Sequence, residues 1–219
     1  MRTIRVTGKG QLRVHPDTTR ITISLEGMGW EYGETLEKSS ADTEKMKDLL
    51  VPFGFERTDL KTLRFDVETV YESYKVNDTY KRRFNGYRFT HMMKVEFGSD
   101  NERLGKILYA LAKSSLKPEF SLSYTVRDPE AVKNELLGEA VRDAVAKAGV
   151  LSGAAGLKLG EIQSMDYSWG TINFEVQPMD RDMKLCEALP CTGNASYDLD
   201  IEPEDIEVQD TVTVVWEIL

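Results

Sequence analysis

The two histidines, His15 and His91, are the side chains most able to exchange protons near neutral pH. His91 lies between Phe89 and Met93 in an alternating segment, which predicts that it sits on the apolar face of a strand. A buried histidine with a hydrogen-bond partner is the commoner role in such a position, and we predict it here. His15 stands beside a proline in His15-Pro16-Asp17, which predicts a turn and no catalysis.

Two glycine-containing segments approach known functional motifs without matching them. Ser152-Gly153 falls inside a predicted helix, whereas a nucleophile elbow needs its serine on a strand-to-helix turn. Gly27-x-Gly29 with Gly33 follows a strand and precedes a helix, as a dinucleotide-binding loop does. The third glycine comes one place late, and the predicted hairpin before it does not suit a parallel βαβ unit. We therefore predict no catalytic residue and no cofactor.

Metal ligands are also few. Asp166 with Glu175 or Asp180 would supply carboxylates for a divalent cation, but we predict no metal site. Cys186 and Cys191 lack the second cysteine or histidine pair that a zinc site requires. They are expected to be reduced thiols in a cytoplasmic protein, and a disulfide if the protein is exported.

Aromatic and basic residues alternate on a predicted long hairpin. One interpretation is that these residues pack against each other across the two strands of the hairpin. The alternative is that they form a contact arm, because subunit interfaces are enriched in aromatic residues and arginine. Single-stranded nucleic acid could also stack on such an arm, but the formal charge of −9 disfavours it. The candidate contact residues are Tyr71, Tyr74, Tyr80, Arg82, Arg83, Phe84 and Tyr87.

Composition limits the other classes. Hydrophobic residues make up 41% of the 219 residues, enough for a core, and the net charge repels nucleic acid and anionic membranes. No window has the roughly 20 apolar residues of a membrane span, and no signal peptide is visible, so we expect a cytoplasmic protein. Periplasmic or exported location is the alternative if a signal has been removed. The start of the chain is basic and its end acidic, and we expect these charges to be solvated at the surface. Complementary patches within or between subunits are the alternative.

The periodicity predicts the element order ββαββαβαββ. This is an α+β, two-layer fold with a mainly antiparallel sheet and helices on one face. The first strand is expected to carry a bulge at Gly8-Lys9-Gly10 and to pair with the second as a hairpin. A long loop is expected over residues 168–204, which are weakly periodic. We predict one unit over 1–219, with two intertwined α+β subdomains, about 1–85 and 86–219, as the alternative.

Several segments in a fixed order resemble the SIMPL-domain family. They are Val6-Thr7-Gly8-x-Gly10, Pro16-Asp17, Gly86-Tyr87, the helix Ala140-Val141-x-Asp143-Ala144-x-x-Lys147-Ala148, Gly156-x-x-x-Gly160, and Ile206-x-Val208 to Val212-x-Val214. The resemblance implies an α+β protein that builds ring- or channel-like homo-oligomers, with some members linked to protection from oxidative stress. It implies no catalytic residues.

Three functions follow from these observations. The first is a non-enzymatic, homo-oligomeric protein whose hairpin and first and last strands pair between subunits. The second is a small-ligand or metal-binding module that uses the 168–204 loop. The third is a hydrolase of unrecognised type, suggested by the many carboxylates and serines.

Overall fold

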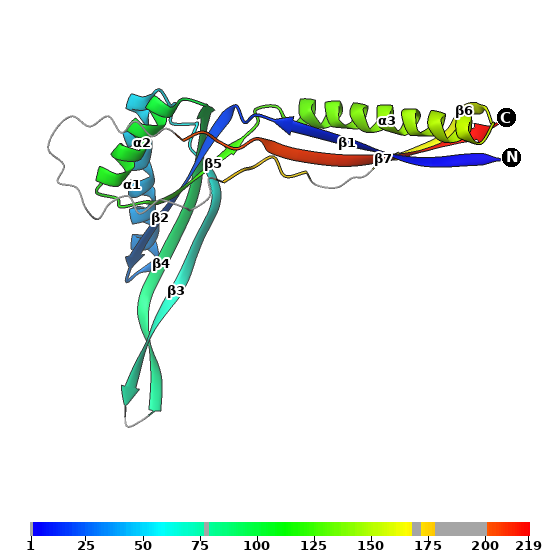
Figure 1. Cartoon of the computed structure of the whole chain (residues 1–219). Helices are drawn as coiled ribbons and strands as arrows, with labels where there is room; N and C mark the ends of the chain where they lie inside the picture. The colour runs from blue at the N-terminus through cyan, green and yellow to red at the C-terminus, as the bar shows by residue number, and fades with distance from the viewer. Residues whose placement is uncertain (1, 77–78, 168–171, 178–200) are drawn as a thin grey trace. The chain divides into compact units, whose positions relative to one another are not determined.

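The computed structural model describes residues 2–76, 79–167, 172–177 and 201–219 of the 219-residue chain. These residues confirm the α+β class and the predicted order of elements (Figure 1). No helix in these ranges is long and apolar enough to cross a membrane. The elements are β1 (Thr3–Val14), β2 (Thr18–Gly29), α1 (Tyr32–Leu50), a 3-10 turn η1 (Val51–Phe53), β3 (Lys61–Val76), β4 (Thr79–Gly98), α2 (Asn101–Lys113), β5 (Glu119–Thr125), α3 (Pro129–Ala154), β6 (Leu159–Tyr167) and β7 (Ile206–Ile218).

The strands divide into two sheets that belong to two compact units. Unit 1 comprises residues 1–17, 124–176 and 203–219, and unit 2 comprises 18–123 and 177–202. Sheet A, in unit 1, has the strand order β1-β7-β6, and the other sheet, sheet B, has the order β3-β4-β2-β5. The helices do not form one layer on one sheet, because α3 packs on sheet A and α1 on sheet B. The boundary considered near residue 85 falls inside β4.

The expected hairpin between the first two strands is wrong. β1 pairs antiparallel with β7 from Thr3↔Glu217 to Val14↔Ile206, and β2 pairs with β4. Alternation along a strand identifies its buried face but not its neighbour, which is why the pairing escaped prediction. β7 is therefore the central strand of sheet A, and the idea that the last strand offers a free edge to another subunit is also wrong.

The two glycines of β1 make room for α3, and the bulge expected there is also wrong. The register with β7 continues through Gly8↔Val212 and Gly10↔Asp210 without a shift. A Cβ atom on Gly8 would lie 2.0 Å from the carbonyl oxygen of Ala140, and one on Gly10 would lie 2.2 Å from that of Leu136. The helix backbone thus rests directly on the strand, and only glycine permits so close an approach.

Small residues on α3 complete this contact. Ala140, Ala144 and Ala148 are fully buried against a cluster that includes Val214 and Trp216 of β7. Nearer the start of α3, Leu136 packs in a second cluster. That second cluster also contains Val126, Phe174, Ile206 and Val208, so residues 172–176 of the expected long loop cover part of sheet A. Most of the remaining loop lies outside the described residues.

Unit 2 builds its core from the alternating face of its central strands. Ile21, Ile23 and Leu25 of β2 are buried, and so are Phe89 and Met93 of β4. The helices supply the opposing side chains, which are Met46 and Leu50 from α1 and Leu104, Ile107, Leu108 and Leu111 from α2.

We predict that Gly8→Ala destabilises unit 1. The added methyl group would overlap the backbone of α3, and overpacking of this kind costs about 1–3 kcal/mol. Chemical denaturation followed by circular dichroism measures the loss. Gly149→Ala is the matched control, because a Cβ at this position near the end of α3 meets nothing within 4 Å and should be neutral or stabilising. Equal stability of the Gly8 variant and the wild type would contradict the close contact.

Candidate functional site

The segments of β1 and α3 that resemble the family motif pack against each other and hold the helix on the strand. Asp143 Oδ2 accepts a hydrogen bond from the backbone N–H of Lys9 at 2.7 Å and from Lys147 Nζ at 2.6 Å. These two donors, the Lys147 ammonium first, lower the pKa of the Asp143 carboxyl. Because the bond from Lys9 joins α3 to the backbone of β1 and the bond from Lys147 lies within α3, Asp143 has a structural role.

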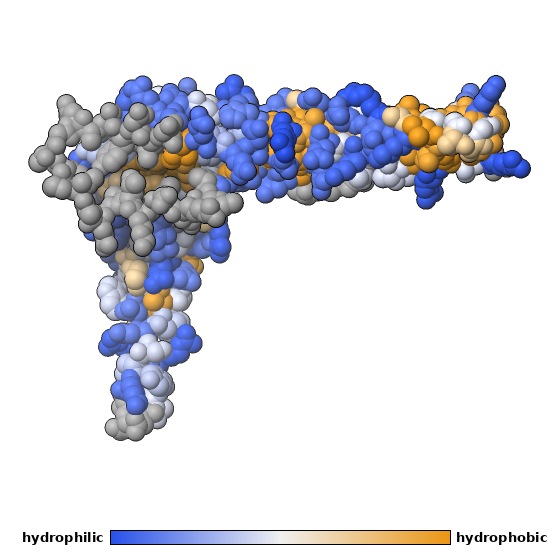
Figure 2. Space-filling model, in the orientation of Figure 1, coloured by the Kyte–Doolittle hydropathy of each residue, from blue (hydrophilic) through white to orange (hydrophobic). Residues whose placement is uncertain are grey.

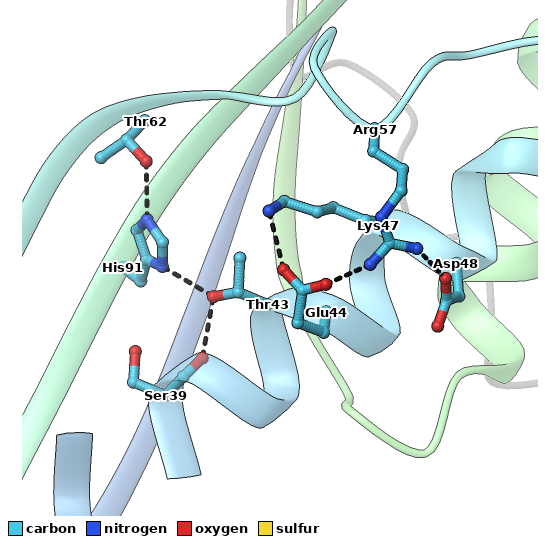
Figure 3. A network of polar contacts seen from close by, with 8 residues as sticks. All are labelled: Ser39, Thr43, Glu44, Lys47, Asp48, Arg57, Thr62 and His91. Carbon is cyan, nitrogen blue, oxygen red and sulfur yellow. Dashed lines mark hydrogen bonds and ion pairs between the residues drawn. The ribbon is translucent and has the colours of Figure 1, made fainter. Parts of the chain in front are cut away.

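His91 lies at the centre of a buried polar network, as the alternation in β4 predicts (Figure 3). Its side chain is 8% exposed, and its ring packs edge-on against Phe65 at 5.1 Å between centroids. Nδ1 lies 2.9 Å from Thr43 Oγ1 on α1, and Nε2 lies 2.9 Å from Thr62 Oγ1 on β3. One imidazole therefore joins three elements of unit 2, which confirms the buried, hydrogen-bonded role.

The direction of each bond follows from the single hydroxyl proton of Thr43. Thr43 Oγ1 donates that proton to the carbonyl oxygen of Ser39 at 2.8 Å, so it accepts from His91 Nδ1–H. In the neutral ring Nε2 then accepts from the Thr62 hydroxyl. Burial lowers the pKa of His91, and the positive charge of Lys47 lowers it further, so the neutral form is favoured.

Surface ion pairs adjoin this network on α1. Arg57 binds both Glu44 and Asp48, and Lys47 Nζ lies 2.8 Å from Glu44 (Figure 3). Hydrogen bonds from Lys47 and then Arg57 lower the pKa of Glu44, and the carboxylates raise that of Arg57. All these groups lie at the surface, where such pairs contribute little to stability.

The glycine-rich segment after β2 serves packing. A Cβ on Gly27 would lie 2.4 Å from the Phe89 ring, and one on Gly29 would lie 2.6 Å from the Thr35 hydroxyl. Gly86 has φ +97° and sits against the Gly29 carbonyl oxygen, a conformation and a distance that exclude other residues. The strands before and after α1, β2 and β3, are not neighbours, because β4 lies between them and is antiparallel to both, so the adjacent parallel strands of a dinucleotide site do not form here.

Within the described ranges, no group of three or more His, Cys, Asp or Glu side chains is placed to hold a metal ion. Asp166 lies on β6, and Glu175 lies in the segment after it. Asp180, Cys186 and Cys191 lie outside the described residues, so their pairing and ligation stay predictions.

The predicted contact residues lie on a two-stranded extension of sheet B, residues 71–87, which we call the hairpin arm. β2 pairs with β4 only as far as Gly29↔Tyr87, whereas β3 and β4 continue together from Tyr71↔Phe84 to Val76↔Thr79 (Figure 1). Side chains on this extension have no third strand beside them among the described residues. The exposed fractions are 51% for Tyr71, 41% for Tyr74, 74% for Tyr80 and 38% for Phe84.

The seven predicted residues divide between the two faces of the hairpin arm. Phe84 contacts Tyr71 at 6.3 Å and Tyr87 at 5.4 Å between ring centroids, and the Arg82 guanidinium lies 5.4 Å from the centre of the Tyr71 ring. Tyr80 shares this face because it precedes Arg82 by two residues on one strand. We call these five the aromatic face.

The other two residues belong to the opposite face. The Arg83 guanidinium stands over the Tyr74 ring at 5.9 Å and pairs with Glu72 at 2.8 Å. Because its charge is neutralised within the hairpin, this face is the less suited to bind another molecule. The seven residues predicted as one contact surface therefore lie on two faces, an aromatic face and a face whose arginine is already paired with Glu72 within the hairpin.

Sequence reasoning missed two members of the aromatic face. Trp30 lies 6.4 Å from Phe84, and Tyr32 lies 5.6 Å from Tyr87, edge to face. They come from the end of β2 and the start of α1 and are 66% and 51% exposed. Two large aromatic residues at the start of a polar helix are visible in the sequence. Only the strand pairing, however, brings them to the hairpin arm.

The opposite charges of the two chain ends meet within sheet A. Arg13 on β1 pairs with Glu207 on β7 at 2.7 Å, and His15 lies 3.1 Å from Asp205. At these two positions, side chains from the basic start and the acidic end are paired within one chain.

Comparisons with known proteins find a family model and several relatives. The family model described as "SIMPL: Protein of unknown function (DUF541)" matches residues 4–216. The chain is 28% identical over 160 residues to a 26 kDa periplasmic immunogenic protein of Brucella abortus (strain S19), covering 73% of this chain and 64% of that protein. It is 22% identical over 211 residues to the uncharacterized protein YggE of Edwardsiella ictaluri (strain 93-146), covering 96% and 84%. The match thus spans slightly less than two thirds of the Brucella relative.

We predict that His91 makes stability depend on pH. The pKa of His91 is lowered in the folded state, so the unfolded chain takes up the proton first as the pH falls. Its contribution is fully present above about pH 6.5 and is lost as the pH falls from there through the lowered pKa, by at most about 1.4 kcal/mol per pH unit.

Urea denaturation between pH 7.5 and 5 measures this dependence. His91→Gln should lower stability at pH 7.5 and flatten the slope, because it removes the titrating ring. His15→Gln is the matched control, since His15 is the other histidine and its side chain is 70% exposed. An unchanged slope in the His91 variant would contradict the assignment.

Proposed function

We propose that this chain, which belongs to the SIMPL family, is a non-enzymatic protein that assembles with copies of itself through the hairpin arm. The observation that carries the proposal is the aromatic face. Tyr71, Tyr80 and Phe84 are more than a third exposed on one face of a two-stranded extension, and the equally exposed Trp30, which follows β2, lies beside Phe84. A two-stranded hairpin is marginally stable alone in water, so burial against a partner would stabilise it.

The composition of the face supports a protein partner. Tyrosine, tryptophan and arginine are the side chains that interfaces enrich, and exposed aromatic groups of this size mark interaction sites on soluble proteins. The hairpin arm contains several lysines and arginines, but the whole chain has a formal charge of −9. That charge favours a protein over nucleic acid as the partner.

Two features support a non-enzymatic role. The motif residues Gly8, Gly10 and Asp143 are used to hold α3 on β1. Both ring nitrogens of His91 are engaged by threonine hydroxyls, which leaves neither nitrogen for a substrate. A hydrolase would need a group free to transfer protons, so we rank that alternative below assembly.

The relatives bear on location and role. The Brucella proteins are named as periplasmic, and this favours an exported location for this chain over the cytoplasmic one expected from its sequence. A part in protection from oxidative stress is implied by the family resemblance and belongs to the same proposal. A ligand or metal module in the 168–204 loop stays a prediction, because most of that loop lies outside the described residues.

We predict that the wild-type protein forms a discrete oligomer and that shortening residues 74–84 to a tight turn reduces it to a monomer. The shortened arm loses Tyr80, Arg82 and Phe84 of the aromatic face, while the pairing of β4 with β2 in sheet B is kept. Size-exclusion chromatography with light scattering gives the mass of each.

Point variants separate loss of contact from misfolding. Phe84→Ser should weaken assembly, whereas Tyr109→Ser should not, since both side chains are 38% exposed but Tyr109 lies on α2 outside the arm. A wild-type protein that stays monomeric at high concentration would refute the proposal.

A further inference from the structure

β1 forms an open edge of sheet A. The strand order is β1-β7-β6, so β1 has a paired strand on one side only. Its pairing with β7 covers all twelve residues from Thr3 to Val14 and has no shift in register. Its other long side therefore presents backbone groups that no strand in the described ranges uses.

The other three edges of the two sheets are less suited to accept a strand. β6 has two shifts in its pairing with β7, and β3 has two shifts in its pairing with β4. β5 already exchanges backbone hydrogen bonds at Tyr124 with Val176, at 2.8 and 2.9 Å. Bulges and covering segments are common protections of an edge. Among the described strands, β1 is the edge with the longest regular register.

The backbone groups that face the open edge belong to the odd-numbered residues of β1. Consecutive residues in an antiparallel pair point their N–H and C=O groups alternately toward the partner strand and away from it. The carbonyl oxygen of Arg2 accepts a hydrogen bond from the N–H of Ile218 at 2.9 Å, so even-numbered residues bond β7. The N–H of Lys9 instead binds Asp143 on α3. The odd-numbered positions from 3 to 7 therefore present open donors and acceptors.

Asp143 shows that a carboxylate oxygen fits this side of β1. It lies 2.7 Å from the backbone nitrogen of Lys9, in the place where an added strand would put a carbonyl oxygen. This contact occupies the middle of the strand. The part of β1 from Thr3 to Thr7 is left open, and we call it the β1 edge.

Two cations without ion-pair partners stand on the outer face of this part of β1. Arg5 and Lys9 are exposed on the face away from α3, opposite uncharged residues of β7. Arg13, on the same face, pairs with Glu207, whereas Arg5 and Lys9 form no ion pair with another residue of the described ranges. Charges more than about 8 Å away are largely screened at physiological ionic strength, so this local pair and not the formal charge of −9 acts on a segment bound here. An acidic segment is the partner that such a pair attracts.

The same cations exclude a second copy of β1. Two β1 strands that pair antiparallel about Lys9 would place Lys9 opposite Lys9 and Arg5 opposite Arg13, and like charges directly opposite each other are destabilising. Cations on an edge usually keep other strands away. Here they reject a basic strand and admit an acidic one, which makes them a source of specificity.

α3 runs in the opposite direction to β1, which places its last turns over the β1 edge. Gly10 meets Leu136, near the start of the helix, and Gly8 meets Ala140 one turn later. Val6 then packs with the alanines of the following turns, so the inner face of the β1 edge is apolar.

The flank of α3 above the open side of β1 is also apolar. Val150 follows Asp143 by seven residues, which is nearly two turns and places the two within about 20° of each other around the helix. Since Asp143 reaches the open side of β1, Val150 lies above that side too, where it is 72% exposed. Figure 2 shows apolar residues gathered over the end of α3.

We propose that the β1 edge binds an extended acidic segment of a partner protein, which adds as a fourth strand of sheet A. Backbone hydrogen bonds to the odd-numbered residues hold the segment. Its carboxylates lie beside Arg5 and Lys9 on the outer face, and the apolar residues between them lie below Val150 on the inner face. Recognition by strand addition takes affinity from the backbone and specificity from alternate side chains in this way. The inference is separate from assembly through the hairpin arm.

Two labelled peptides test this pairing. Fluorescence anisotropy should show that Val-Glu-Val-Glu-Val binds the wild-type protein and that Val-Lys-Val-Lys-Val does not. Arg5→Glu with Lys9→Glu should weaken binding of the acidic peptide about tenfold or more and allow the basic peptide to bind. Thr7→Pro should also weaken it, because proline removes a donor from the open edge and leaves the bonds to β7 in place.

Lys45→Glu with Lys106→Glu is the control for net charge. It makes the same change in charge at two exposed lysines of unit 2 and should leave peptide binding unchanged. Circular dichroism checks that each variant folds. Equal binding of both peptides by the wild type, or no binding of either, would overturn the inference. Binding that survives Thr7→Pro but not the charge reversal would also overturn it, because a surface contact without an added strand would then be enough.

Discussion

Two residues without side chains, Gly8 and Gly10, let the backbone of α3 rest on β1, and the arrangement of unit 1 depends on that contact. Because the helix is so close, alanines suffice to fill the space beneath it, and Asp143 reaches the backbone of the strand. The same contact fixes the helix over two of three strands. The buried alanine cluster is therefore a result of this one steric condition.

The surface that we assign to assembly lies where packing within the chain ends. The hairpin arm is exposed because β2 stops pairing with β4 at Gly29. Its aromatic face is largely apolar, whereas a solvent-facing end is usually polar. A protein that leaves aromatic and aliphatic side chains at such places gains stability when a partner covers them.

Two polar side chains of types that often act in catalysis, His91 and Asp143, have structural partners within this chain. His91 joins α1, β3 and β4 through two threonine hydroxyls, and Asp143 holds a helix on a strand. A residue type that performs catalysis elsewhere is here satisfied by donors and acceptors of its own chain. Chemistry would require one of these atoms to be free and aimed at open space.

The sequence by itself determined the order of the elements and the burial of His91, because both follow from local periodicity. It also located five members of the aromatic face, since a hairpin brings neighbours in the chain together. Only the tertiary structure decided that β1 pairs with β7, that Gly8 serves a helix and not a bulge, and that Trp30 joins the hairpin arm. Strand pairing over a distance of 200 residues depends on the matched surfaces of whole elements, which no local pattern records.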